Sequence, residues 1–161
     1  DVPGSGRPPP AKEGPDNLKF PFNRLSGEML MNTPIQKIIL EVFRESSEGR
    51  MHFGAVVSML TQAGVVSYVV DFRTRKTTYY LPSDDTLSLD LDMPDVAIAD
   101  AFDSDAIKSA IRGSQQGIVK YPEFKRLSCE AGCIGYTVWI QGRHVTYLGR
   151  RGESHAERFP D

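Results

Sequence analysis

The sequence predicts an α+β fold made by internal duplication of an α-α-β-β-β unit, with antiparallel strands and helices packed on one face. The first observation is that residues 38–91 align with residues 106–159 without a gap, at an offset of 68 positions. The second is that each copy has two stretches of helical periodicity followed by three of alternating periodicity. A repeat changes the interpretation of the whole fold. Identical residues at this offset include Arg44/Arg112, Ser46/Ser114, Gly49/Gly117, Gly64/Gly132, Tyr68/Tyr136 and Tyr79/Tyr147.

Composition indicates an ordinary globular protein. The chain has 161 residues, of which 40% are hydrophobic and 25% charged, and its net charge is −2. It contains no apolar run of the roughly 18–20 residues that a membrane span needs, and its beginning lacks the pattern of a secretory signal. Two cysteines are too few for a disulfide framework, so we expect a reducing, cytoplasmic setting and no membrane partner.

Four segments follow from composition and the repeat. Residues 1–30 lack periodicity and are rich in Pro and Gly, which predicts a disordered leader. Residues 31–91 and 106–161 form the two repeat units, which we expect to share one core. Residues 92–105 form a connector with five acidic and no basic side chains. Residues 106–160 carry nine basic and four acidic side chains, a surplus of five that makes the second unit the one to attract an anion.

Each unit should begin with two helices. In the first unit Thr33 is predicted as an N-cap, with Pro34 at the first helical position and Gln36 completing a capping box. The second helix is predicted over residues 53–63, and its copy over residues 121–131. Both end at glycine, which tolerates the left-handed conformation at a helix end.

Three strands should follow in each unit. Alternation of apolar residues predicts a first strand around Tyr68 and its copy around Tyr136. Short turns lead to second strands at residues 76–81 and 144–148, and to third strands at residues 86–91 and 154–159. Trp139 is predicted on the face opposite Tyr136.

Several phrases of this sequence resemble the YdfO-like family of small bacterial and prophage-borne proteins, a domain of unknown function. The resemblance covers about residues 31–161. It implies an α+β fold and brings no accepted catalytic residues, and some relatives carry a phage-envelope label. The phrases are Tyr68–Arg73, Lys76–Tyr80, Ile98–Asp103, Tyr121–Phe124, Ala131–Tyr136 and Gly142–Tyr147.

The third strand carries the candidate site, because the two copies differ there. Leu87 and Leu89 of the first unit correspond to His155 and Glu157 of the second. Residues two apart on a strand project to one side, so an imidazole and a carboxylate replace a leucine face. Such a pair can transfer protons or hold an anion. The alternative is a plain charged edge strand. We expect a pocket to which three further residues contribute: Arg143, His144 and Tyr147.

The residue pattern predicts no cofactor and no metal site. Cys129 and Cys133 are four apart but straddle the predicted helix end at Gly132, and the chain has only three histidines, so no zinc spacing is met. No phosphate-binding loop, dinucleotide fingerprint or nucleophile elbow occurs. Backbone donors at Gly152, after Arg150 and Arg151, offer a weak anion signal.

Together these features favour a non-enzymatic ligand-binding or regulatory module with its site on the second unit, and an anionic or polar small molecule as partner. The alternatives are a small cytoplasmic enzyme that uses a His/Glu/Tyr pocket, a nucleic-acid-binding protein and a phage-associated protein. The basic second unit is compatible with nucleic acid, although no nucleic-acid module is recognised and the acidic connector opposes it. The sequence predicts no particular oligomeric state.

Overall fold

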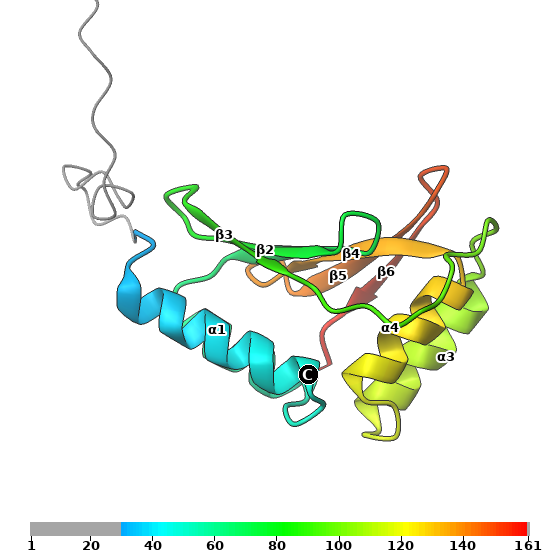
Figure 1. The fold of residues 1–161 in the computed structure, drawn as a ribbon, viewed down its shortest axis with the longest axis horizontal. Helices are drawn as coiled ribbons and strands as arrows, with labels where there is room; N and C mark the ends of the chain where they lie inside the picture. Colours follow the sequence, from blue (N-terminus) through cyan, green and yellow to red (C-terminus); the bar gives the residue numbers. More distant parts are fainter. Residues whose placement is uncertain (1–29, 161) are drawn as a thin grey trace, which may run out of the picture.

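The computed structural model describes residues 30–160, so nearly all of the predicted leader lies outside the described residues. The described helices lie on one side of a sheet, and none of them covers its other side (Figure 1). The predicted α+β fold with two α-α-β-β-β units is confirmed. The helices are α1 (Thr33–Ser47), α2 (Phe53–Gln62), α3 (Ser104–Gln115) and α4 (Tyr121–Glu130). The strands are β1 (Ser67–Asp71), β2 (Lys76–Tyr80), β3 (Thr86–Asp90), β4 (Cys133–Trp139), β5 (His144–Gly149) and β6 (Ser154–Arg158).

The two units join edge to edge through their first strands. The sheet order is β3-β2-β1-β4-β5-β6, and all neighbouring strands are antiparallel. In the central pair Tyr68 lies opposite Val138 and Val69 opposite Thr137. Thr137 follows Val69 by 68 positions, the repeat offset. A pseudo-twofold axis therefore passes between these two residues and relates one unit to the other.

Backbone conformation repeats at the same offset. Eight residues with φ between +60° and +92° form four pairs separated by 68 positions. They end helices and close hairpins, where the left-handed region is required. The recurrence shows that the duplication extends to individual turns. The pairs are Gly49/Gly117, Gly64/Gly132, Arg75/Arg143 and Asp84/Gly152.

The core lies between the helices and the covered face of the sheet. Alternate residues of the four central strands point into it, including the pairs Tyr68/Tyr79 and Tyr136/Tyr147, whose ring centroids lie 5.2 and 5.4 Å apart. The opposite face is polar, and Trp139 lies there as predicted, 42% exposed. One covered and one open face is typical of antiparallel sheets.

The connector after β3 packs against the second unit. The amide of Ala99 donates to the carbonyl of Cys129, and the amide of Asp103 donates to the carbonyl of Ala131, at 2.9 and 2.8 Å. Gly132 lies so close to this segment that a Cβ there would approach the Ala101 carbonyl oxygen to 2.0 Å. The contact explains why the second unit needs glycine at this helix end for space as well as for conformation.

Two details of the helix starts differ from the sequence prediction. Asn32, not Thr33, caps α1, because its side chain accepts a hydrogen bond from the amide of Ile35 at 3.0 Å. Asparagine is at least as good a cap as threonine, so Thr33 and Pro34 become part of the first turn. Helix α4 has Lys120 at the N-cap and no side-chain cap bond.

Candidate ligand-binding site

A cavity shared by the two units lies where they meet. Its volume is about 230 Å³. The turn between α1 and α2 and the turn between α3 and α4 contribute to its wall, with the covered faces of β1, β4 and β5 and the end of β6. The sequence analysis expected a site on the second unit. The structure instead shows a cavity shared by both.

The wall is built from equivalent residues of the two repeats. Seven pairs at the offset of 68 contribute both members, so the cavity lies on the pseudo-twofold axis. Only the second unit adds residues from its second and third strands, among them Val145, Tyr147 and Glu157. The part of the wall that comes from the helices and first strands is symmetric. The part that comes from the second and third strands is not. The seven pairs are Ser46/Ser114, Gly49/Gly117, Met51/Val119, His52/Lys120, Phe53/Tyr121, Val56/Phe124 and Tyr68/Tyr136.

Neutral tyrosines make up the polar part of the interior. The hydroxyl of Tyr136 donates to the hydroxyl of Tyr121 at 2.8 Å. Burial raises the pKa of Tyr68, Tyr121, Tyr136 and Tyr147 above the ordinary value, so all four stay protonated at neutral pH. A neutral hydroxyl can both donate and accept a hydrogen bond. The cavity therefore presents aromatic surface with adaptable polar points rather than interior charge.

His155 and Glu157 lie side by side on the covered face of β6, as their spacing predicts. The Nε2 atom of His155 donates to Oε1 of Glu157 at 2.9 Å, and Nη1 of Arg112 donates to Oε2 at 3.4 Å. The His155 ring stacks on Tyr147, with centroids 6.3 Å apart. Glu157 and Tyr147 line the cavity. Because Arg112 and His155 engage both carboxylate oxygens, the charge of Glu157 is largely compensated.

The other two predicted site residues lie elsewhere. His144 stacks on Trp139 with ring centroids 6.3 Å apart, on the uncovered face, because Val145 and Tyr147 take the inward positions of β5. Arg143 occupies the preceding turn at φ +60°, with its guanidinium 5.4 Å from the centroid of the Phe159 ring. The expectation that both share the pocket of His155 and Glu157 is not met. Strand alternation, applied to β5, already excluded His144.

Two cations border the cavity without an ion-pair partner among the described residues. They are Lys120, at the start of α4, and Arg158, at the end of β6; both are exposed. A third, Arg50, is held by Glu45 and Glu48 at 2.9 and 2.5 Å. Arg158 lies opposite His144 in the pairing of β5 with β6, on the uncovered side of the strand, so Lys120 is the cation that remains for the cavity itself.

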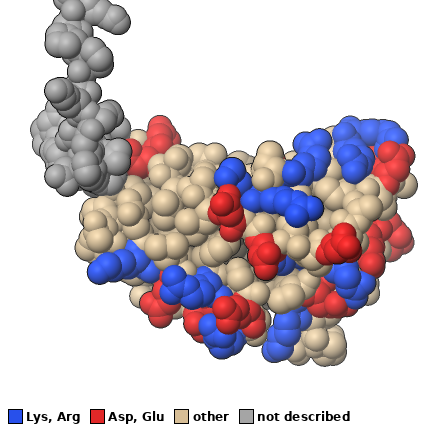
Figure 2. Space-filling view, in the orientation of Figure 1, with Lys and Arg blue, Asp and Glu red and all other residues tan. Residues whose placement is uncertain are grey.

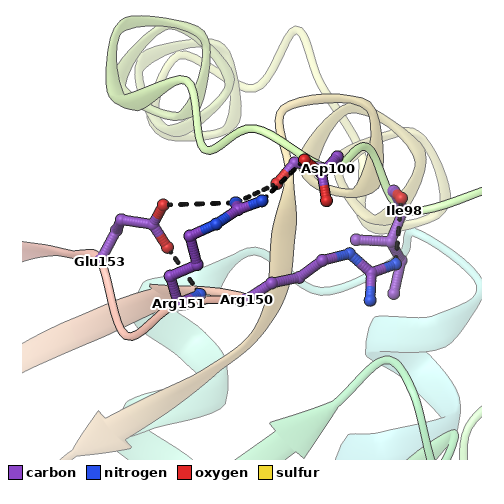
Figure 3. A network of polar contacts seen from close by, with 5 residues as sticks. All are labelled: Ile98, Asp100, Arg150, Arg151 and Glu153. Carbon is purple, nitrogen blue, oxygen red and sulfur yellow. Dashed lines mark hydrogen bonds and ion pairs between the residues drawn. The ribbon is translucent and has the colours of Figure 1, made fainter.

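The connector accepts hydrogen bonds from the two arginines that precede Gly152, at the turn for which the sequence offered a weak anion signal. Arg150 donates to the carbonyl of Ile98, and Arg151 donates to the carbonyl and carboxylate of Asp100 (Figure 3). The amide of Gly152 donates to the carbonyl of Gly149. On the face shown in Figure 2, basic and acidic groups are interspersed. This arrangement disfavours an anion or nucleic-acid site at the turn.

Buried thiols and a buried amine lie in and beside α4. Cys129 and Cys133 are free, and burial raises the pKa of both thiols, to about 11 for Cys133. Within residues 30–160 no group of three or more His, Cys, Asp or Glu side chains could hold a metal ion. Lys125, 3% exposed, donates to the carbonyl of Asp92, and burial lowers the pKa of its amine.

Sequence reasoning missed both the shared cavity and Lys125. The repeat itself could have located the cavity, since the equivalent aromatic positions Phe53 and Tyr121 begin equivalent helices. Lys125 gave no such signal: its counterpart is Val57, and a lysine in a helix ordinarily indicates a solvent face. Its burial arises from the connector.

The comparisons place the chain among proteins without an assigned role. No described helix is long and apolar enough to cross a membrane. Uncharacterised proteins of Mycobacterium bovis and Mycobacterium tuberculosis are 30% identical to the chain over 95 residues, which is 53% of this chain. The chain covers 58% of the length of these relatives. A family model described as "Protein of unknown function (DUF1398)" matches residues 41–156. That match includes most of both repeat units, and the chain therefore belongs to the DUF1398 family.

Proposed function

We propose that this protein is a small-molecule-binding module whose site is the cavity between the two repeat units. The observation that carries the proposal is the cavity of about 230 Å³, lined by seven equivalent pairs of residues. A concave space with mostly apolar and aromatic walls and a few polar groups is the usual form of a ligand site. The family's unknown function and the resemblance to YdfO-like prophage-borne proteins are compatible with such a module.

The ligand that fits best is a ring-bearing molecule with one carboxylate. A cavity of about 150 Å³ suffices for benzene, so the larger space here suits one or two rings. Tyr68, Tyr121 and Phe124 supply apolar surface for the ring. Lys120, which has no ion-pair partner among the described residues, supplies charge for the carboxylate.

The alternatives have weaker support. An enzyme would need a free acid or base in the cavity, whereas Arg112 and His155 occupy both oxygens of Glu157. Nucleic-acid binding would need a continuous basic surface, whereas Arg151 is paired with Asp100. A phage-associated structural role predicts stable higher-order assembly, which size-exclusion chromatography with light scattering would reveal.

Thermal unfolding with two probes tests the proposal. Phenylacetate carries a ring and a carboxylate, and phenylacetamide is its neutral counterpart. At ten times the dissociation constant, binding adds about 1.4 kcal/mol and raises the melting temperature by about 3–5 °C. Lys120→Gln should weaken phenylacetate binding several-fold without affecting phenylacetamide. Lys108→Gln, on α3 outside the cavity wall, is the matched control.

Filling the cavity gives an independent test. Val56→Phe places there the residue that the second unit has at position 124, and Ser114→Leu fills the opposite wall. Both variants should abolish binding of either probe. Val69→Phe adds the same volume as Val56→Phe on the uncovered face of β1 and should leave binding unchanged. Undiminished binding by the two filled variants would contradict the proposed site.

A further inference from the structure

A polar side chain is buried in β2 without a protein partner. Thr77 is 2% exposed, and its Oγ1 atom has no hydrogen-bond partner among the described residues. It lines a second cavity of about 30 Å³. Burying a hydroxyl without a partner costs about 1–3 kcal/mol, so native proteins rarely leave one unpaired. Thr77 therefore indicates a polar group that occupies this small cavity.

The fold does not require a hydroxyl at this position. The equivalent residue of the second unit is Val145, whose side chain has the shape of a threonine side chain without the hydroxyl. Val145 lines the shared cavity. The strands β2 and β5 are otherwise equivalent in pairing and burial. Because valine serves the same structural position, the threonine hydroxyl points to recognition rather than to folding.

The small cavity adjoins the shared cavity. Five residues contribute to both walls, including Tyr68, Tyr121 and Tyr136. Tyr136 donates to Tyr121, while the hydroxyl of Tyr68 has no hydrogen-bond partner among the described residues. A volume of about 30 Å³ suits one water molecule or one ligand hydroxyl. Several hydroxyl-bearing residues thus line a space of the right size for one polar group.

We propose that this small cavity is the inner subsite of the ligand site, and that Thr77 selects ligands with a hydroxyl at the end opposite their carboxylate. The inference rests on the proposed function. When no ligand is bound, a water molecule takes the subsite and satisfies Thr77. The ligand class becomes a hydroxyaryl carboxylate, with its acid at Lys120 and its hydroxyl beside Thr77, Tyr121 and Tyr136.

Isothermal titration with phenylacetate and 4-hydroxyphenylacetate tests the selection. The native protein should bind the hydroxylated probe about tenfold more tightly, a preference that one good hydrogen bond explains. Thr77→Val should reduce the ratio to about one while phenylacetate affinity stays unchanged. Thr77→Ser, which keeps the hydroxyl, should retain the preference. An unchanged ratio in Thr77→Val, or no preference in the native protein, overturns the subsite.

A stability comparison separates failure of the subsite from failure of the proposed function. Ser128 on α4 is the matched control: its Oγ atom is also buried without a partner among the described residues, yet it lines neither cavity. If the subsite holds a water, Thr77→Val should lower the melting temperature, whereas Ser128→Ala should maintain or raise it. If neither probe binds, the proposed function fails. The melting temperature of Thr77→Val then still tests the polar subsite. A value above that of the native protein would show that no polar group occupies the small cavity.

Discussion

Phe53 and Phe159 pack edge to face, with ring centroids 5.5 Å apart and planes at 79°, and this contact joins the start of α2 to the chain just beyond β6. Arg143 also holds Phe159 in place: its guanidinium lies over the ring, and its carbonyl accepts from the amide of Phe159 at 3.0 Å. Both phenylalanines line the cavity. The last residues of the second unit thus close the cavity against the first unit.

Phe159→Ala should therefore both destabilise the protein and open the cavity. Phe159 is only half-buried, so we expect a loss of about 1–3 kcal/mol, less than the 3–5 kcal/mol typical of a fully buried phenylalanine. Phenylacetate should bind more weakly and dissociate faster. Denaturant unfolding and stopped-flow measurements check both. Trp139→Ala, on the uncovered face, should leave probe binding intact; if it weakens binding equally, the effect is not local.

The double substitution His155→Leu with Glu157→Leu restores the residues of the first unit. We expect a free energy of unfolding within about 1 kcal/mol of the native value, or higher, because leucines replace a half-buried polar pair. Glu157→Leu alone should be less stable than the double variant, since it leaves His155 without its partner. Urea unfolding of the three proteins checks this order. A double variant that loses several kcal/mol would show that the pair is needed for folding.

Alkaline pH should unfold the protein cooperatively. Burial raises the pKa of five tyrosines above 10, so their stabilising contribution is complete below pH 10 and is lost as pH rises toward the folded-state values. Each buried tyrosine lowers the free energy of unfolding by about 1.4 kcal/mol per pH unit in that range. Five together remove a typical domain stability of 5–15 kcal/mol within about one to two pH units.

Absorbance at 295 nm, which follows tyrosinate, and circular dichroism check this behaviour together. Both signals should change in one step between about pH 11 and 12. Gradual ionisation with retained secondary structure would contradict the burial of Tyr68, Tyr79, Tyr136 and Tyr147.

Two glycines of the second unit, Gly117 and Gly132, separate the need for a left-handed backbone conformation from the need for space. Gly117 has φ +77° and no atom within 4 Å of an added Cβ, whereas Gly132 has φ +83° and the carbonyl oxygen of Ala101 at 2.0 Å. Gly117→Ala should cost about 1–2 kcal/mol for the left-handed conformation alone. Gly132→Ala should cost about 1–3 kcal/mol more, because the connector must move. Equal melting temperatures for the two variants would contradict the packing of the connector.

Much of the fold was accessible from local pattern. Helices α2 and α4 begin at the predicted residues, and His155 and Glu157 share a face, because periodicities of 3.6 and 2 are properties of the backbone. The N-cap of α1 was misplaced by one residue, since Asn32 and Thr33 are both competent caps. His144, which was expected to contribute to the pocket, lies on the uncovered face, because strand alternation gives the inward positions of β5 to Val145 and Tyr147.

The sequence by itself determined the duplication, the order of the elements and the positions of the turns, because apolar periodicity and glycines act over a few residues. Only the tertiary structure decided that β1 pairs with β4 and that the two helix hairpins meet over this pair. That pairing joins residues 64 to 72 positions apart, and no local preference encodes it. It created the shared cavity, buried Lys125 beneath the connector and placed Thr77 beside Tyr121 and Tyr136.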